Sequence, residues 1–194
     1  MLLGLTGGMA CGKSLAGKYF AELGWNVLDA DKLAAQVLRE DPQVQDTLVK
    51  RWGTQVQKEG AFDRTHIASI VFQDLAELDF LEKLLHPKVL HCWQSQVDGA
   101  PEKKWLVEVP LLFEVGWERH FPTVMAIGAG PQVVSQRIRQ REGDFQAWKK
   151  RSERQWSLPR KMSAANFVLW NNGEAVFLQE QIRFLQSHPA LQNP

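Results

Sequence analysis

The residues best suited to chemistry in this sequence are the eight from Gly7 to Ser14, which read GGMACGKS. Their spacing is G-x-x-x-x-G-K-[ST], the motif of the phosphate-binding loop. The glycines allow a tight turn, so that successive backbone N–H groups can converge on one anion. Lys13 adds a positive charge near the outer phosphates, and the Ser14 hydroxyl is a candidate ligand for Mg²⁺. The sequence therefore predicts a site for a polyphosphate.

The residues on either side of this loop agree with that prediction. The apolar run 1–5 predicts a buried strand before the loop. After it, Ala16, Phe20 and Leu23 recur at helical spacing, and Gly24 is a suitable helix end. A helix in this place directs its positive N-terminal end at the same anion. The alternative is a glycine-rich turn that only joins a strand to a helix.

Two carboxylates follow the next predicted strand, residues 25–28. Asp29 and Asp31 lie between this strand and a helix expected over residues 32–39. Polar residues at this position reach the edge of a parallel sheet where ligands bind. We expect one of them to cap the helix and the other to be available for chemistry. The alternative is that both are caps or solvated acids.

The most basic stretch of the chain covers residues 135–161. A nucleic-acid patch, a solvated face and a mobile cover over phosphates are all compatible with such a stretch, and the phosphate-binding loop favours the cover. Arg137 and Arg141 are four residues apart and share one helical face, which suits a polyphosphate. The basic residues of this stretch are Arg137, Arg139, Arg141, Lys149, Lys150, Arg151, Arg154, Arg160 and Lys161.

The elements that must position these residues alternate between strand and helix. Strands are expected at residues 1–5, 25–28, 105–109, 123–127 and 167–170. Residues 42–97 are expected to be helical, with Asp63 and Asp74 as N-caps and with Pro87 breaking or kinking the helix that follows Asp74. Alternating strands and helices form a parallel sheet with right-handed crossovers. The predicted fold class is therefore α/β, a three-layer phosphate-binding-loop fold with a five-stranded parallel sheet.

The composition is that of an ordinary globular domain. The 194 residues are 44% hydrophobic and 23% charged, with a net charge of +1. This charge balance gives no reason to expect nucleic acid or a membrane surface as a partner. The two cysteines have neither metal-ligand spacing nor a disulfide framework, and the first residues are expected to form a strand rather than a signal peptide. We expect a cytoplasmic protein that is a monomer or weak oligomer.

Several classes of nucleotide-binding protein share the loop motif. A GTPase is expected to carry Asn-Lys-x-Asp, which this sequence lacks. A motor ATPase normally needs a longer chain. The basic stretch and the helical insertion favour a kinase that acts on a small molecule, since they supply a cover and an acceptor site. A nucleoside- or nucleotide-type kinase and a non-catalytic nucleotide-binding module are the alternatives.

The chain resembles the dephospho-CoA kinase family from end to end. The segments that carry the resemblance are LTGGMACGKS at 5–14, VLDAD at 27–31, FDRTHIASIVF at 62–72, LHP at 85–87, VPLLFE at 109–114 and NNG at 171–173. The resemblance implies transfer of the γ-phosphate of ATP to the 3′-hydroxyl of the dephospho-CoA ribose, the last step of coenzyme A synthesis. It also implies a core of about residues 1–31, 100–134 and 162–194, a helical acceptor-binding region at about 32–99 and a helical lid at about 135–161.

The resemblance also implies roles for individual residues. Asp31 matches the catalytic base, Lys13 and Arg141 complete the catalytic set, and Ser14 is the Mg²⁺ ligand. The residues implied in ATP binding are Gly8, Ala10, Cys11, Gly12, Lys13, Ser14, Leu15, Arg137, Arg141 and Asn171, the last as part of the adenine pocket. The residues implied in dephospho-CoA binding are Asp31, Arg64, His86, Pro110 and Leu111.

Some positions depart from the family pattern. Leu15 replaces a usual Thr, Cys11 a common Ser, and Asn166 a usual Asp, while Glu108 stands where relatives have Asp or an apolar residue. Cys11 lies at a helix N-terminus beside Lys13, and both features favour a reactive thiolate. The alternative for Cys11 is an inert small residue whose backbone alone serves the loop.

Overall fold

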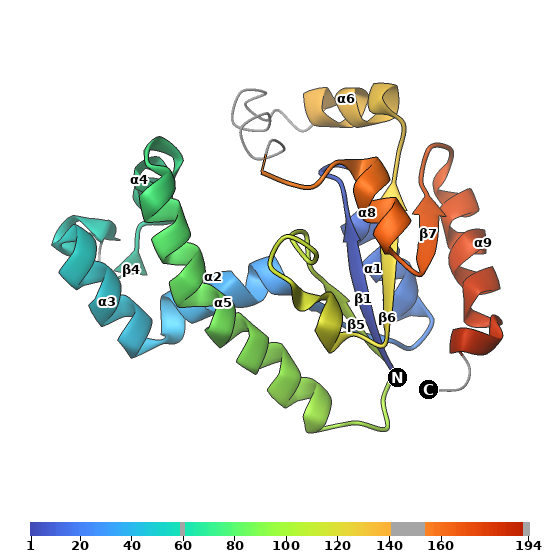
Figure 1. The fold of residues 1–194 in the computed structure, drawn as a ribbon, viewed down its shortest axis with the longest axis horizontal. Coiled ribbons are helices and arrows are strands. Elements are labelled where there is room, and N and C mark those ends of the chain that lie inside the picture. The colour runs from blue at the N-terminus through green and yellow to red at the C-terminus, as the bar shows by residue number, and fades with distance from the viewer. Residues whose placement is uncertain (59–60, 141–153, 192–194) are drawn as a thin grey trace. The chain divides into compact units, whose positions relative to one another are not determined.

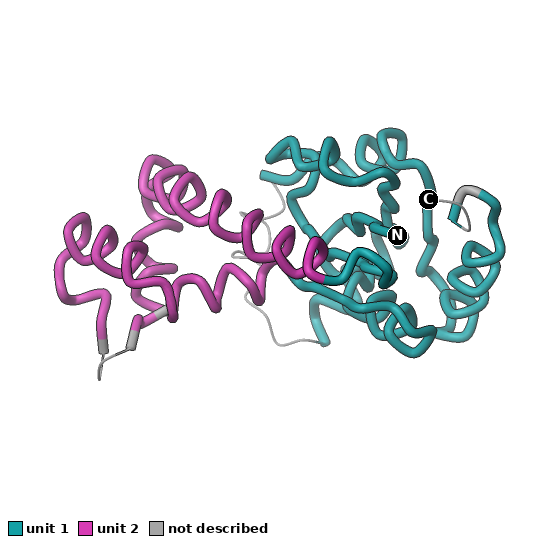
Figure 2. Tube along the Cα trace, turned by 90° about the horizontal axis from the view of Figure 1, so that it is seen from below, with its two compact units in different colours: residues 1–29, 100–194 teal, residues 30–99 magenta. Residues whose placement is uncertain are grey.

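The fold is described from a computed structural model, which describes residues 1–58, 61–140 and 154–191. The chain divides into two compact units (Figure 2). Unit 1 consists of residues 1–29 and 100–194, and unit 2 of residues 30–99. Among the described residues, none of the helices combines the length and the apolarity that a membrane span requires.

Unit 1 contains a five-stranded sheet in the order β2-β5-β1-β6-β7, and every neighbouring pair is parallel (Figure 1). The strands are β1 (Leu2–Gly7), β2 (Asn26–Asp29), β5 (Trp105–Glu108), β6 (Thr123–Gly128) and β7 (Phe167–Trp170). Each predicted strand is present, with ends that differ by no more than two residues. The prediction of an α/β fold with a five-stranded parallel sheet is confirmed.

Helices cover this sheet and bury its apolar side chains. They are α1 (Lys13–Glu22), α6 (Pro131–Gln140), α8 (Leu158–Ala164) and α9 (Ala175–Gln186), with 3₁₀ turns at Trp117–His120 and Pro189–Leu191. Leu3 and Leu5 of β1 pack with Phe20 of α1 and Ile182 of α9 in one buried cluster. Because side chains alternate along a strand, the other residues of β1 face the opposite side, where α8 contacts β1 and β6 (Figure 1).

Unit 2 is mainly helical. Its elements are α2 (Ala30–Glu40), α3 (Pro42–Trp52), a 3₁₀ turn (Thr54–Val56), β3 (Gln57–Lys58), β4 (Ala61–Phe62), α4 (Arg64–Gln73) and α5 (Leu75–Asp98). The carboxylates of Asp63 and Asp74 accept hydrogen bonds from N–H groups in the first turns of α4 and α5, which confirms both predicted caps. The antiparallel pair β3–β4 interrupts the region predicted as helical. Strands of two residues are too short to show a periodicity of their own.

A break or a kink was predicted at Pro87, and the structure contradicts the break. Helix α5 continues from Leu75 to Asp98 with Pro87 inside it. A proline inside a helix removes one N–H donor and clashes with the preceding turn. Here α5 packs along both α2 and α4, and these tertiary contacts maintain the helix across the proline.

Candidate nucleotide-binding site

The loop between β1 and α1 has a backbone that its neighbours enclose. Gly7 and Gly12 have φ values of 152° and 102°, which side chains other than hydrogen rarely allow. A Cβ atom on Gly7 would lie 2.2 Å from the Ile127 carbonyl oxygen, and one on Gly12 would lie 2.2 Å from Asn171 Nδ2. Both glycines of the motif are therefore required by the backbone and by the space around it. Ala10 also has a left-handed backbone, with φ 59°.

Lys13 and Ser14 open helix α1 at the end of this loop. Lys13 Nζ lies 3.0 Å from the carbonyl oxygens of both Gly7 and Gly8, so the ammonium group is held inside the loop. Ser14 is exposed in the first helical turn. The N-cap Gly12 offers no side-chain acceptor to the first N–H groups of α1. These groups and the positive helix end are available to an anion.

Asn171 and Arg137 donate hydrogen bonds to backbone carbonyl groups of the loop. Asn171 follows β7 and is 2% exposed, and its Nδ2 donates to the Cys11 carbonyl oxygen at 2.9 Å. Arg137 of α6 donates to Asn171 Oδ1 and to the Ala10 carbonyl oxygen, both at 3.3 Å. Two loop carbonyls are thus engaged by these side chains, and within the loop the Cys11 N–H donates to the Gly8 carbonyl oxygen at 3.3 Å. The Asn171 side chain, predicted for the adenine pocket, is directed at the loop backbone.

Cys11 is a buried residue of this loop. It is 2% exposed and belongs to the hydrophobic cluster that also contains Leu5 and Ile127. Burial raises the pKa of the Cys11 thiol, against smaller lowering effects of Lys13 and Arg137. This direction argues against a reactive thiolate and favours the alternative of an inert small residue, because desolvation outweighs the nearby positive charges. Cys11 is a small core residue of the loop.

Two carboxylates lie side by side at the carboxyl edge of the sheet. Asp29 ends β2 and is in register with Glu108, which ends β5. Glu108 is 6% exposed, and a Cβ atom on Gly17 would lie 2.0 Å from its Oε1, so its carboxylate lies against the backbone of α1. Gly17 is three residues after Ser14 and shares its helical face. The register that pairs Glu108 with Asp29 has no signal in the sequence.

The oxygen atoms available near the loop suit Mg²⁺. The part of the chain that the structure describes contains no group of three or more His, Cys, Asp or Glu side chains able to hold a metal. Mg²⁺ is usually held by one or two protein oxygens together with substrate phosphates and water. An exposed hydroxyl at Ser14, at the end of a phosphate-binding loop, fits this pattern. It does not provide a metal site independent of a nucleotide.

The segment after β5 forms a second loop at the same edge of the sheet. The Pro110 carbonyl oxygen accepts a hydrogen bond from Thr6 Oγ1 at 3.2 Å, and Leu112 and Phe113 are buried. The Pro110 carbonyl oxygen also accepts a hydrogen bond from Lys161 Nζ. Lys161 was grouped with the basic stretch that was expected to cover phosphates. It is fully buried and lies in the interior of unit 1 instead.

Three predicted acceptor-side residues lie in unit 2. Asp31 is exposed in the first turn of α2, where a negative charge also complements the helix dipole. His86 is half-buried within α5, and Arg64 is the first residue of α4. Residues 141–153 of the predicted lid, with Arg141 among them, lie outside the described residues. Of the predicted site residues, the structure brings Arg137 and Asn171 into contact with the phosphate-binding loop. Asp31, Arg64 and His86 belong to the other unit.

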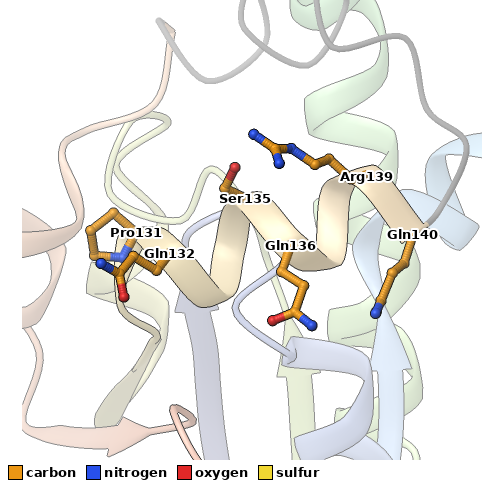
Figure 3. Close-up of a pocket in the computed structure, with 6 residues that line it drawn as sticks. All are labelled: Pro131, Gln132, Ser135, Gln136, Arg139 and Gln140. Atoms are coloured by element: carbon orange, nitrogen blue, oxygen red, sulfur yellow. The ribbon is translucent and has the colours of Figure 1, made fainter.

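An open hollow runs along helix α6 (Figure 3). Its described lining residues all belong to α6: Ser135 and Arg139 point to one side of the helix, and Gln136 and Gln140 to the other. Among the described residues, none of the predicted site residues lines it. The site is instead identified by the loop after β1 and the side chains that brace it.

Comparison with known proteins agrees with this geometry. The family model described as dephospho-CoA kinase matches residues 1–176. A dephospho-CoA kinase of Gloeobacter violaceus is 34% identical over 183 residues, which cover 93% of this chain and 89% of the relative. One of Fusobacterium nucleatum is 32% identical over 190 residues, covering 96% and 98% of the two chains.

Solved structures give the same result. The chain resembles a crystal structure from Thermus thermophilus with a TM-score of 0.81 at 26% identity, covering 96% of each chain. It resembles the dephospho-CoA kinase from Campylobacter jejuni with a TM-score of 0.69 at 27% identity, covering 95% of each. A shikimate kinase from Aquifex aeolicus, with a TM-score of 0.54 at 17% identity over all of both chains, shares the fold alone. On the family match and the full-length relatives together, this chain belongs to the dephospho-CoA kinase family.

Proposed function

We propose that this protein transfers the γ-phosphoryl group of ATP to the 3′-hydroxyl of the ribose of dephospho-CoA, giving coenzyme A and ADP. The observation that carries the proposal is the braced phosphate-binding loop from Gly7 to Ser14 in a chain of this family. The finer expectations of a cytoplasmic setting and of a monomer or weak oligomer remain predictions.

On the donor side, the chain supplies positive electrostatic potential to the phosphates. Phosphoryl transfer places charge on the γ-phosphate oxygens, and fixed N–H dipoles and cations stabilise that charge. We assign this role to the loop N–H groups, to Lys13 and to Arg137. Asn171 holds the loop in the shape that presents its N–H groups. Ser14 would hold Mg²⁺, which supplies further charge neutralisation when it is bound.

On the acceptor side, the chain must orient a hydroxyl and take its proton. We assign the proton-accepting role to Asp31, because a carboxylate in this position can orient the ribose hydroxyl and remove its proton as the phosphoryl group arrives. Arg64, His86, Pro110 and Leu111 are assigned to dephospho-CoA binding. Arg141 stays a prediction for the ATP phosphates.

The test is a coupled assay of ADP release with ATP, Mg²⁺ and dephospho-CoA. We expect ADP release to require dephospho-CoA and the product to comigrate with coenzyme A in liquid chromatography with mass detection. Coenzyme A is the matched control acceptor, since its 3′-position already carries a phosphate. Equal turnover with adenosine, AMP or shikimate as acceptor would contradict the proposal and indicate another small-molecule kinase. ATP binding without turnover of any acceptor would indicate a non-catalytic module.

A further inference from the structure

We propose that Lys161 is a positioning residue, which with Glu114 fixes the loop at Pro110 and Leu111 relative to the phosphate-binding loop. The proposal deepens the proposed function, since that function assigns Pro110 and Leu111 to the acceptor dephospho-CoA. Lys161 is on α8, far along the chain from both loops.

The contacts of Lys161 converge on one backbone atom. Its Nζ donates to the Pro110 carbonyl oxygen and forms an ion pair with Glu114 Oε1 at 2.9 Å. The same carbonyl accepts from Thr6 Oγ1 at 3.2 Å. Thr6 is on the central strand β1, one residue before the phosphate-binding loop begins. The Pro110 carbonyl therefore accepts hydrogen bonds from two elements: β1, which leads into the phosphate-binding loop, and α8.

Glu114 also connects the Pro110 loop to the residues just before α8. Its Oε1 accepts from the Trp156 backbone N–H at 2.6 Å, just before α8. The Trp156 ring stacks on the Phe113 ring, with centroids 5.5 Å apart and planes 10° apart. The chain at 156–161 and the loop at 110–114 are thus joined by two charged side chains and a ring stack.

Helix α8 also lies beside the phosphate-binding loop. Leu158 packs against the hydrophobic cluster that contains Cys11, and a Cβ atom built on Gly8 would lie 3.9 Å from Leu158 Cδ1. One short helix therefore lies beside the phosphate-binding loop at Leu158 and contacts the Pro110 loop through Lys161. A change in how α8 is held alters the distance between the two loops. Phosphoryl transfer is sensitive to such changes, because a misplacement of about 1 Å can cost about 10²-fold in rate.

The burial of Lys161 is costly, which argues for a specific role. It is 0% exposed, and burial lowers the pKa of its ammonium group, although the bond to Glu114 opposes this. An apolar side chain of similar volume could fill the same space, and replacing a buried ion pair in this way is often neutral or stabilising. What an apolar side chain cannot provide is a donor for the Pro110 carbonyl. The geometry of that bond is the function we assign to the lysine.

The experiment compares Lys161→Met with the parent enzyme under conditions where thermal unfolding shows both to be folded. We expect kcat/KM for dephospho-CoA to fall about 10²-fold, while KM for ATP changes by less than about threefold. Lys161→Arg keeps a donor and should restore part of the loss. Arg160→Met is the matched control: Arg160 is exposed on the same helix, over the Trp156 ring, and should change kcat/KM by less than about threefold.

A second measurement does not depend on turnover. Hydrogen exchange at the amides of residues 111–114 should be faster in Lys161→Met, and unchanged in Arg160→Met. If Lys161→Met does not fold because Glu114 is left as an unpaired buried charge, Glu114→Gln with Lys161→Met removes that charge and is measured instead. Unchanged exchange and unchanged kcat/KM in the folded variant would overturn the proposal, as would an equal loss in Arg160→Met. A parent enzyme that does not phosphorylate dephospho-CoA would overturn the proposed function, and hydrogen exchange would still test the positioning.

Discussion

The residues proposed for the donor side and those proposed for the acceptor side differ in kind: the first form a loop defined by its backbone, and the second are mainly single side chains. In unit 1, the phosphate-binding loop is defined by its backbone, with Gly12 enclosed by neighbours and Asn171 buried behind it. In unit 2, the residues proposed for the acceptor lie on helices, and Asp31 is exposed to solvent. Substitutions of residues that hold this loop, such as Asn171, should therefore act through its shape, whereas substitutions of Lys13 or Asp31 should act through the loss of one functional group.

The substitution with the largest expected effect is Asp31→Asn on the acceptor side. Removal of a general base should lower kcat by about 10²–10⁴-fold and leave ATP binding unchanged. The measurements are steady-state turnover and ATP titration by calorimetry. Asp46→Asn, another exposed acid in unit 2, is the control and should retain parent activity. Near-parent turnover of Asp31→Asn would mean that another group takes the proton.

On the donor side, Lys13→Ala should weaken ATP binding and turnover together. Loss of a preorganised cation at the phosphates corresponds to about 10²–10³-fold in kcat/KM for ATP. Lys18→Ala removes an exposed lysine of the same helix and serves as the control. If Lys13→Ala lowered only kcat/KM for dephospho-CoA, the division between donor and acceptor sides would be wrong.

Asn171→Ala tests whether the loop acts through its shape. It removes the hydrogen bond to the Cys11 carbonyl and a partner of Arg137. We expect KM for ATP to rise about tenfold, and the stability to fall by about 1–3 kcal/mol, because buried polar partners are left unsatisfied. Chemical denaturation and ATP kinetics measure both. Asn172→Ala, at the exposed neighbour whose Oδ1 accepts from Gly130, is the control. Equal changes in both variants would remove the special role of Asn171.

The smallest predicted effects distinguish the two units by pH. In unit 1, the pKa of Lys161 is lowered by burial. The unfolded chain then binds more protons at this group between the lowered pKa and the ordinary value of about 10.5, so the contribution of Lys161 to stability should rise with pH in that window. In unit 2, hydrogen bonds from Arg51 and Lys88 lower the pKa values of Glu77 and Asp41, respectively. Their stabilisation is present above about pH 4 and is lost as the pH falls through the lowered values.

Hydrogen exchange resolved by residue measures both pH responses in one chain. Amides of β1 and β6 report on unit 1, and amides of α3 and α5 on unit 2. Lys161→Met should remove the rising contribution of the lysine in unit 1. It should leave the falling contribution of the Cys11 thiol, whose pKa is raised by burial, and the acid response of unit 2. Identical pH profiles in the two units would show that they unfold together and that these groups do not distinguish them.

The fold was predictable where the determinants are close together in the sequence. The strands at 105–108 and 167–170 are short apolar runs, and the phosphate-binding loop is eight contiguous residues with a fixed spacing. Asp63 and Asp74 were predictable as caps because a cap bonds to N–H groups two or three residues away.

The rest depends on contacts between distant residues. Lys161 stands in a basic stretch, and nothing in that pattern shows that it pairs with Glu114 inside the core. Asp29 and Glu108 become neighbours only through the register of β2 with β5. The continuity of α5 across Pro87 depends on packing against other helices, which local propensity does not contain. The roles of Asp31, Arg64 and His86 came from resemblance to a family, since single polar residues on helices carry no distinctive spacing.

The insertion of unit 2 between two adjacent strands also has a consequence for how the chain reaches its native state. Strands β2 and β5 pair with each other, yet the whole of residues 30–99 separates them. Closing a free loop of this length costs entropy that grows with the logarithm of its length. If α2 and α5 associate first, the helix pair shortens the effective loop roughly sevenfold, which lowers that cost by about 1.7 kcal/mol. We therefore expect the helical insertion to form early and to accelerate assembly of the sheet that flanks it.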